Sequence, residues 1–179
     1  MPDASCVASN RPDVSRGVTM RLPGLTVLVT AVSLAVLHCP AAAELRTATL
    51  RGVEEVPAIS TEAAGLFAAF VSDDAIAFTL TYNDLEGGSV SAAHIHFGQS
   101  GVNGGIVIHF CGTGGKPACP APPATVTGTA TSADVVAVTA QGIAAGDIAA
   151  VARGLREGKT YVNVHTTTFA GGEIRGQIR

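Results

Sequence analysis

The feature that most constrains the fold is a succession of short segments in which apolar and polar residues alternate. Residues 75–82 (AIAFTLTY) and 160–166 (TYVNVHT) show this alternation, and Gly, Pro, Asn or Asp residues separate such segments along the chain. Period-two alternation is typical of strands with one buried face. The segments span residues 45–53, 65–71, 75–82, 89–97, 106–110, 125–131, 160–166 and 173–178. Together they predict an all-β domain, an antiparallel β-sandwich or Greek-key-like barrel of about eight strands.

One segment breaks this pattern and predicts a short helix. Within residues 147–157 the apolar residues recur at helical spacing, and Gly158 provides a stop. Ser132 is expected to cap a brief helical turn at residues 133–136. No internal repeat and no linker divides this region, so one domain is predicted.

The N-terminal part of the chain resembles a secretory leader. Residues 25–37 form an uncharged apolar run, with Arg21 before it and the small residues Ala41, Ala42 and Ala43 after it. This order of basic, apolar and small residues is typical of a signal peptide, and it predicts cleavage after Ala43. A retained anchor and a lipoprotein acylated at Cys39 are the alternatives, although His38 replaces the small residue expected before a lipoprotein cysteine.

The expected organisation is therefore an N-terminal segment at residues 1–43 that contains the signal peptide, and a β domain at residues 44–179. Met20 would give a more ordinary start than Met1. The product is expected to be exported to the periplasm, the medium or the cell surface. No membrane span is expected after cleavage, because the apolar run is too short for one.

The charge balance argues against nucleic acid as a partner. The chain has 11 basic and 14 acidic residues and no Trp. Nucleic-acid binding normally needs clustered positive charge, and no such cluster is present. The expected partner is an unidentified protein, surface or small ligand.

Three of the predicted strands carry polar side chains opposite their apolar residues. In one of them His94 and His96 alternate with Ile95 and Phe97, so the two pairs point to opposite faces. The same alternation in the two C-terminal strands gives a further polar set: Tyr161, Asn163, His165, Glu173, Arg175 and Gln177. If these strands are neighbours, the polar residues meet on one outer face.

The histidines of this set suit a metal ion. His94 and His96 at i and i+2 on one strand can both bind zinc or copper, and His165 can complete the site. Its candidate surroundings are Glu173, Arg175 and Asn163, in which the carboxylate is a fourth ligand or an acceptor that fixes a histidine tautomer. Since binding needs neutral imidazoles, affinity should fall below about pH 6.

The alternative is a polar outer face held by hydrogen bonds, with no cofactor. Polar residues opposite a core face are common in antiparallel sheets. His109 lies outside these strands' motifs and is interpreted as structural. Glu54 and Glu55 are interpreted as surface charges at a strand end.

Cys111 and Cys119 lie in one loop rich in Gly and Pro. In an exported domain this arrangement predicts a disulfide, with two free thiols as the alternative. No nucleophile elbow or phosphate-binding loop is recognisable.

Four segments recur together in one known family: residues 52–57 (GVEEVP), 93–98 (AHIHFG), 161–166 (YVNVHT) and 171–177 (GGEIRGQ). In this order the chain resembles the CHRD domain, a module first named from chordin and common in exported bacterial proteins. The resemblance covers nearly all of residues 44–179. It implies a secreted β-sandwich-like domain with a non-enzymatic binding or structural role. The alternative is a small extracytoplasmic metalloenzyme, because the His-x-His strand faintly resembles that of copper–zinc superoxide dismutases.

Overall fold

A computed structural model describes residues 42–179. The predicted leader, with its alternative at Cys39 and the choice between Met1 and Met20, falls on residues outside this range. The described residues form eight strands: β1 (Glu44–Arg51), β2 (Ala64–Val71), β3 (Ile76–Asn83), β4 (Val90–Phe97), β5 (Gly105–Cys111), β6 (Ala124–Ala130), β7 (Thr160–Thr166) and β8 (Ile174–Gln177). One α-helix, α1 (Ile148–Arg156), and three short 3-10 helices (Gly52–Glu54, Ser132–Asp134 and Thr139–Gln141) complete the described region.

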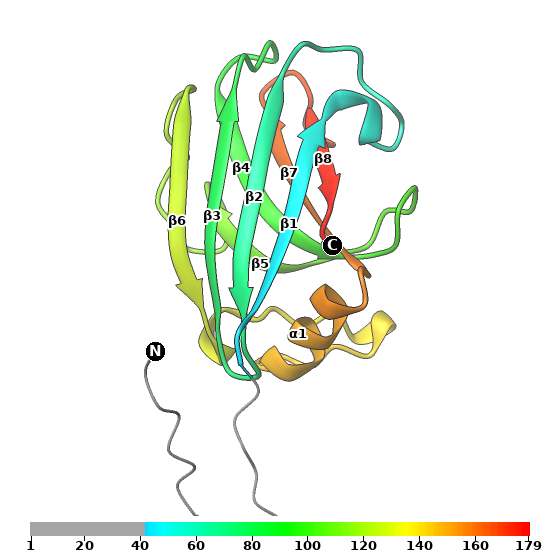
Figure 1. Cartoon of the computed structure of the whole chain (residues 1–179). Coiled ribbons are helices and arrows are strands. Elements are labelled where there is room, and N and C mark those ends of the chain that lie inside the picture. Colours follow the sequence, from blue (N-terminus) through cyan, green and yellow to red (C-terminus); the bar gives the residue numbers. More distant parts are fainter. Residues whose placement is uncertain (1–41) are drawn as a thin grey trace, which may run out of the picture. The chain divides into compact units, whose positions relative to one another are not determined.

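The strands form a single antiparallel sheet in the order β5-β4-β7-β8-β1-β2-β3-β6. The sheet curls into a nearly closed barrel, with β6, β3, β2 and β1 on one side and β4, β5 and β7 behind them (Figure 1). β5 and β6 are its two edges, and β5 bridges to Val135, just beyond β6, through Ile108. The predicted all-β, antiparallel, eight-stranded architecture is confirmed.

The inward residues of the strands build one core. Leu50, Phe67, Leu80, Ile95 and Val162 are each at most 2 % exposed, as the period-two pattern requires. Burying each such side chain stabilises the fold by about 1.5–3 kcal/mol. The interior of the barrel is therefore apolar, and the polar side chains of the strands lie on the opposite face of the sheet.

The helix α1 lies across one end of the barrel (Figure 1). Its apolar side, including Val151 and Leu155, is fully buried, and the Asp147 carboxylate caps it by accepting a hydrogen bond of 2.9 Å from Ala150 N. This matches the predicted helix at residues 147–157. At nine residues α1 is much too short to span a bilayer, and no other helix of the described region is long and apolar enough.

Two local predictions need correction. The helical turn expected at residues 133–136 is a 3-10 helix one residue earlier, and Thr131, not Ser132, caps it in a capping box with Asp134. The first strand ends at Arg51, where the chain enters another 3-10 helix, Gly52–Glu54. This second turn changes the direction of the side chains that follow it.

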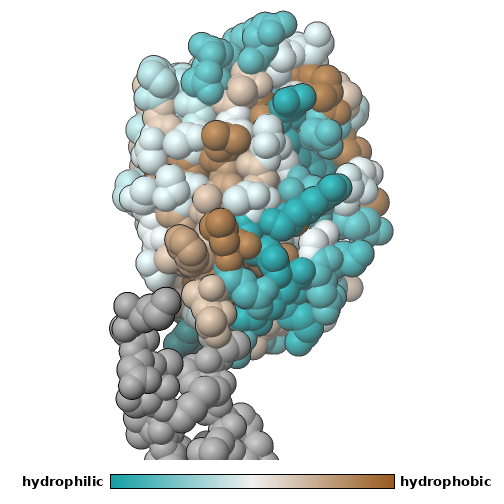
Figure 2. All heavy atoms as spheres, viewed as in Figure 1, coloured by the Kyte–Doolittle hydropathy of each residue, from teal (hydrophilic) through white to brown (hydrophobic). Residues whose placement is uncertain are grey.

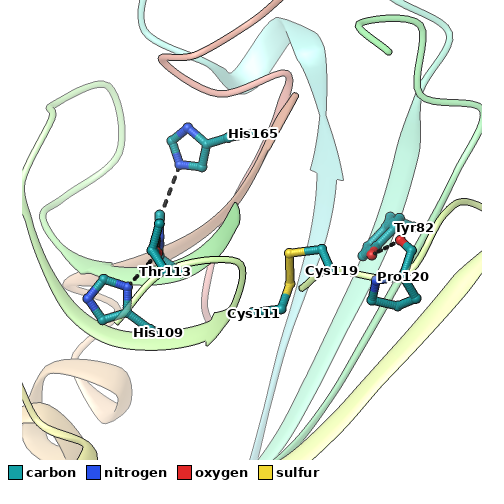
Figure 3. Close-up of a disulfide and its surroundings, with 8 residues drawn as sticks. Tyr82, His109, Cys111, Thr113, Cys119, Pro120 and His165 are labelled. Atoms are coloured by element: carbon teal, nitrogen blue, oxygen red, sulfur yellow. Dashed lines mark hydrogen bonds between the residues drawn. A yellow bond between two sulfur atoms is a disulfide. The ribbon is translucent and has the colours of Figure 1, made fainter. Parts of the chain in front are cut away.

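The predicted disulfide between Cys111 and Cys119 is confirmed, with a Cα–Cα distance of 4.9 Å (Figure 3). Directly after Cys119 the chain is tied to the barrel by Tyr82 of β3, whose hydroxyl donates a 2.6 Å hydrogen bond to Pro120 O. Between the two cysteines the loop contributes Thr113, which faces the histidines described below.

The outer face of the β1–β2–β3–β6 half lacks a dense charged cluster. Its cross-strand rows consist mostly of Thr and Ala, with Leu66 and Phe70 exposed among them. Figure 2 shows this as pale spheres with separate brown spots, while the hydrophilic colour gathers at the lower right, toward the helix end, and at the top of the view. The polar residues of interest lie on the other half of the sheet.

Candidate metal centre

Three neighbouring strands bring the polar side chains together. β7 lies between β4 and β8 in the sheet. In this register His94 lies opposite Asn163, which lies opposite Arg175. In the next row His96 lies opposite Tyr161. The condition on which the sequence prediction depended, that these strands are neighbours, is met.

The polar face is buried, which corrects its interpretation as an outer face. His94 is 4 % exposed, His96 8 % and Asn163 2 %. Loops fold back over the face, and their carbonyl groups accept hydrogen bonds from it: Gly104 O lies 2.9 Å from His96 Nδ1, and Ala170 O lies 2.9 Å from a nitrogen of His165. Alternation predicts which side chains share a face, but it carries no information on which loop covers that face.

The imidazoles of His94, His96 and His165 converge. Each offers one ring nitrogen, and these three atoms lie within 4.8 Å of one another. The shortest contact joins His94 Nδ1 to His165 Nε2 at 3.2 Å. Ligands around zinc, with bonds of about 2.0–2.1 Å, lie roughly 3.3 Å apart in a tetrahedron. The His94–His165 separation matches this spacing, and the cluster as a whole would have to contract from its limit of 4.8 Å around a bound ion.

The hydrogen bonds of these neutral rings determine their tautomers. Because Ala170 O can only accept, His165 Nδ1 carries the proton and Nε2 has the lone pair. His94 Nδ1 must then donate to His165 Nε2, and His94 Nε2 accepts from Thr113 Oγ1 at 2.7 Å. Thr113 Oγ1 in turn accepts from His109 Nδ1 at 2.9 Å. Figure 3 shows His165, Thr113 and His109 along this chain, so His109 supports the cluster without belonging to the converging three.

His96 has a lone pair without a partner. Its Nδ1 donates to Gly104 O, so Nε2 is an acceptor, and Nε2 is buried with no hydrogen-bond partner among residues 42–179. Its ring stacks on Tyr161 at 4.7 Å and 4°. The Arg175 guanidinium covers the Tyr161 ring at 3.4 Å, a cation–π contact that fixes the stack. The unpartnered nitrogen is therefore held rigidly in place.

Burial keeps these histidines neutral. It lowers the pKa of His94 to about 3, with further lowering by His165, and lowers the pKa of His96 to about 4. The pKa of His165 is lowered as well, again because of burial. Charged imidazoles cannot be solvated there and repel one another. At neutral pH each ring therefore keeps one lone pair. That of His94 lies on Nε2 in this tautomer, so metal binding through His94 Nδ1 would move the ring proton to Nε2, where Thr113 Oγ1 can accept it.

Glu173 lies apart from the histidines, contrary to the arrangement considered from the sequence. Its fully buried carboxylate accepts from the backbone N–H groups of Glu86 and Gly87, at 2.6 and 3.0 Å. It also accepts from the hydroxyls of Thr61 and Thr166, at 3.1 and 2.8 Å. These bonds occupy the carboxylate in joining loops to the sheet.

Glu55 is buried beside the polar side chains of β7 and β8, which overturns its interpretation as a surface charge. It is 6 % exposed, and burial raises its pKa to about 7, although the charge of Arg175 and hydrogen bonding from Asn163 lower it. The interpretation assumed a continuing strand, whereas the 3-10 helix Gly52–Glu54 turns Glu55 inward. The recurring segment GVEEVP was the signal in the sequence that could have identified this residue.

Comparison with known proteins gives one match. The family model of the CHRD domain matches residues 46–178. No curated protein matches the chain. No solved structure matches it either.

Proposed function

This chain belongs to the CHRD domain family, and from that premise we propose that it is a binding module whose ligand is a transition-metal ion held by His94, His96 and His165. The observation that carries the proposal is the convergence of three neutral, buried imidazoles within 4.8 Å. If these buried polar side chains had only a structural role, their nitrogen and oxygen atoms would be expected to form hydrogen bonds with each other, whereas His96 Nε2 has no hydrogen-bond partner in the described region. Imidazole ligands suit zinc and copper, which are the proposed ions.

Burial favours binding over catalysis. A catalytic metal keeps an open position for water or substrate, and loop carbonyls and Thr113 surround these rings on several sides. The alternative is a small metalloenzyme of the superoxide dismutase kind. It predicts that added azide perturbs the spectrum of the copper-loaded protein, while a closed binding site predicts no change.

We expect the exported protein, freed of metal with a chelator, to bind zinc or copper at one equivalent in a calorimetric titration. His165→Ala should weaken this binding by more than about 100-fold, because loss of a ligand exceeds the effect of losing a surrounding hydrogen bond. His109→Ala should weaken it far less, since His109 packs edge-on against His94 and bonds to Thr113 but is not one of the three converging histidines. Melting curves of the metal-free variants check that each is folded. Identical titrations of wild type and His165→Ala would refute the proposal.

We also propose that the domain works outside the cytoplasm. The leader pattern at residues 25–43 supports export, and so does the disulfide, which persists in oxidising compartments. Mass spectrometry of the exported protein should then give Glu44, or a residue close to it, as the first residue. An exported product that retains the apolar run would contradict this prediction.

A further inference from the structure

Asn163 occupies the middle of the proposed centre. It lies on the central strand β7, between His94 of β4 and Arg175 of β8. Its side chain is 2 % exposed, and its Oδ1 lies 3.0 Å from His165 Nε2. The amide oxygen is therefore as close to a converging histidine nitrogen as the histidines are to each other.

Neither Asn163 Oδ1 nor His165 Nε2 carries a proton that it could donate to the other. His165 Nε2 has a lone pair, because the proton of that ring is on Nδ1 and donates to Ala170 O. An amide oxygen also has only lone pairs to offer. Two acceptors in contact repel each other. The proton that His94 Nδ1 donates to His165 Nε2 offsets part of this repulsion, and a cation bound by both acceptors would remove it. The 3.0 Å separation is near the roughly 3.3 Å of two ligands on one tetrahedral ion.

Glu55 accounts for the direction in which the amide points. A Cβ added to Gly172 would lie 2.1 Å from Glu55 Oε1 and 2.9 Å from Asn163 Nδ2, so the carboxylate and the NH₂ group both border this glycine. An NH₂ group beside a carboxylate is favourable, whereas the flipped amide would direct its oxygen at that carboxylate. The missing side chain at Gly172 leaves room for this arrangement.

We propose that Asn163 Oδ1 is the fourth ligand of the metal ion, and that Glu55 is the positioning residue that keeps this oxygen directed at the centre. The inference rests on the proposed metal-binding function and completes its donor set as three imidazole nitrogens and one amide oxygen. Both metals accept oxygen ligands of this kind beside imidazoles.

The test compares two substitutions of similar size in the full chain. Asn163→Leu removes the oxygen and should weaken zinc binding by roughly 10-fold to 100-fold in a calorimetric titration. Asn163→Asp keeps an oxygen directed at the centre, although its second oxygen lies beside Glu55, so it should bind zinc much more tightly than Asn163→Leu. In the cobalt-loaded protein the visible absorption bands should shift in Asn163→Leu and keep tetrahedral intensity in Asn163→Asp.

Glu55→Ala provides the positioning test, and its exposed neighbour provides the matched control. Freed of the carboxylate, the amide can turn, so Glu55→Ala should weaken zinc binding by about 10-fold, while Glu54→Ala should leave it unchanged. If wild type and Asn163→Leu have equal zinc affinity and equal cobalt spectra, while His165→Ala loses zinc binding, the fourth-ligand assignment is overturned and the metal-binding function stands. Absence of binding in wild type would instead refute the metal-binding function itself.

Discussion

Replacing Glu173 with alanine should lower the free energy of unfolding by about 3–5 kcal/mol, because four hydrogen-bond donors would lose their common acceptor. The carboxylate accepts hydrogen bonds from the turn at Glu86 and Gly87, from Thr61 and from Thr166. Without it, one buried and one partly buried backbone N–H group and two hydroxyls lose their partner. A domain with a total stability of about 5–15 kcal/mol would then lose a large fraction of it.

Urea denaturation followed by circular dichroism measures this loss, and Glu54→Ala is the control. Glu54 is exposed and belongs to the same end of the molecule, so its removal should change the free energy of unfolding by less than about 0.5 kcal/mol. If the two variants unfold at the same urea concentration, the hydrogen bonds of Glu173 contribute little net stability.

Acid should destabilise the metal-free protein well before carboxylates are protonated. The pKa values of His94 and His96 are about 3 and about 4 in the folded state, against about 6.5 in an unfolded chain. Between pH 6.5 and 4 the unfolded state therefore binds protons that the native state does not. Stability is fully present above pH 6.5 and falls as the pH drops, by up to about 1.4 kcal/mol per pH unit for each histidine.

Glu55 opposes this trend. Its folded pKa of about 7 lies above its ordinary 4.5, so between those values the native state holds a proton that the unfolded state has lost. Its contribution to stability is present below pH 4.5 and is lost as the pH rises through 7. The two histidines outweigh this one carboxyl, so the net slope below pH 6.5 is destabilising.

Melting temperatures in a chelator, measured from pH 7.5 to 4.5, check the acid prediction. Wild type should lose melting temperature steadily below pH 6.5, and Glu55→Gln should lose it more steeply because the opposing group is gone. A constant melting temperature across this range would contradict burial of neutral histidines. The same lowered pKa values correct the earlier expectation for metal affinity, which should persist below pH 6 because these rings remain unprotonated there.

Much of the fold could be predicted because each strand repeats a simple pattern. Alternation identified the strands and assigned His94, His96 and His165 to the side opposite Ile95 and Val162, whose side chains are fully buried in the core. The sheet order was beyond the sequence, because β4 becomes a neighbour of β7 through long-range pairing that no local pattern encodes, although β7 and β8 pair across a short turn.

The composition of the site was harder to predict than its location. Glu55 was misplaced because a single 3-10 turn breaks the strand rule on which the face assignment depended. Thr113 was missed because it lies in a loop, where no periodicity specifies direction. Glu173 was placed near the histidines because it shares their strand face in sequence, whereas the backbone N–H groups of a distant turn hold its carboxylate.

The two edges of the sheet face each other across a seam beside the disulfide loop. A cavity of about 380 Å³ lies there, bordered by loop residues such as Pro117 and Pro120 and by residues 125–130 of β6. Exposed strand edges are templates on which a second molecule can add a strand, and natural proteins block them with prolines, covering loops or closure. Prolines and a covering loop meet at this seam, and the disulfide keeps the loop beside it. The disulfide loop therefore lies beside strand backbone that an uncovered edge would offer to another chain.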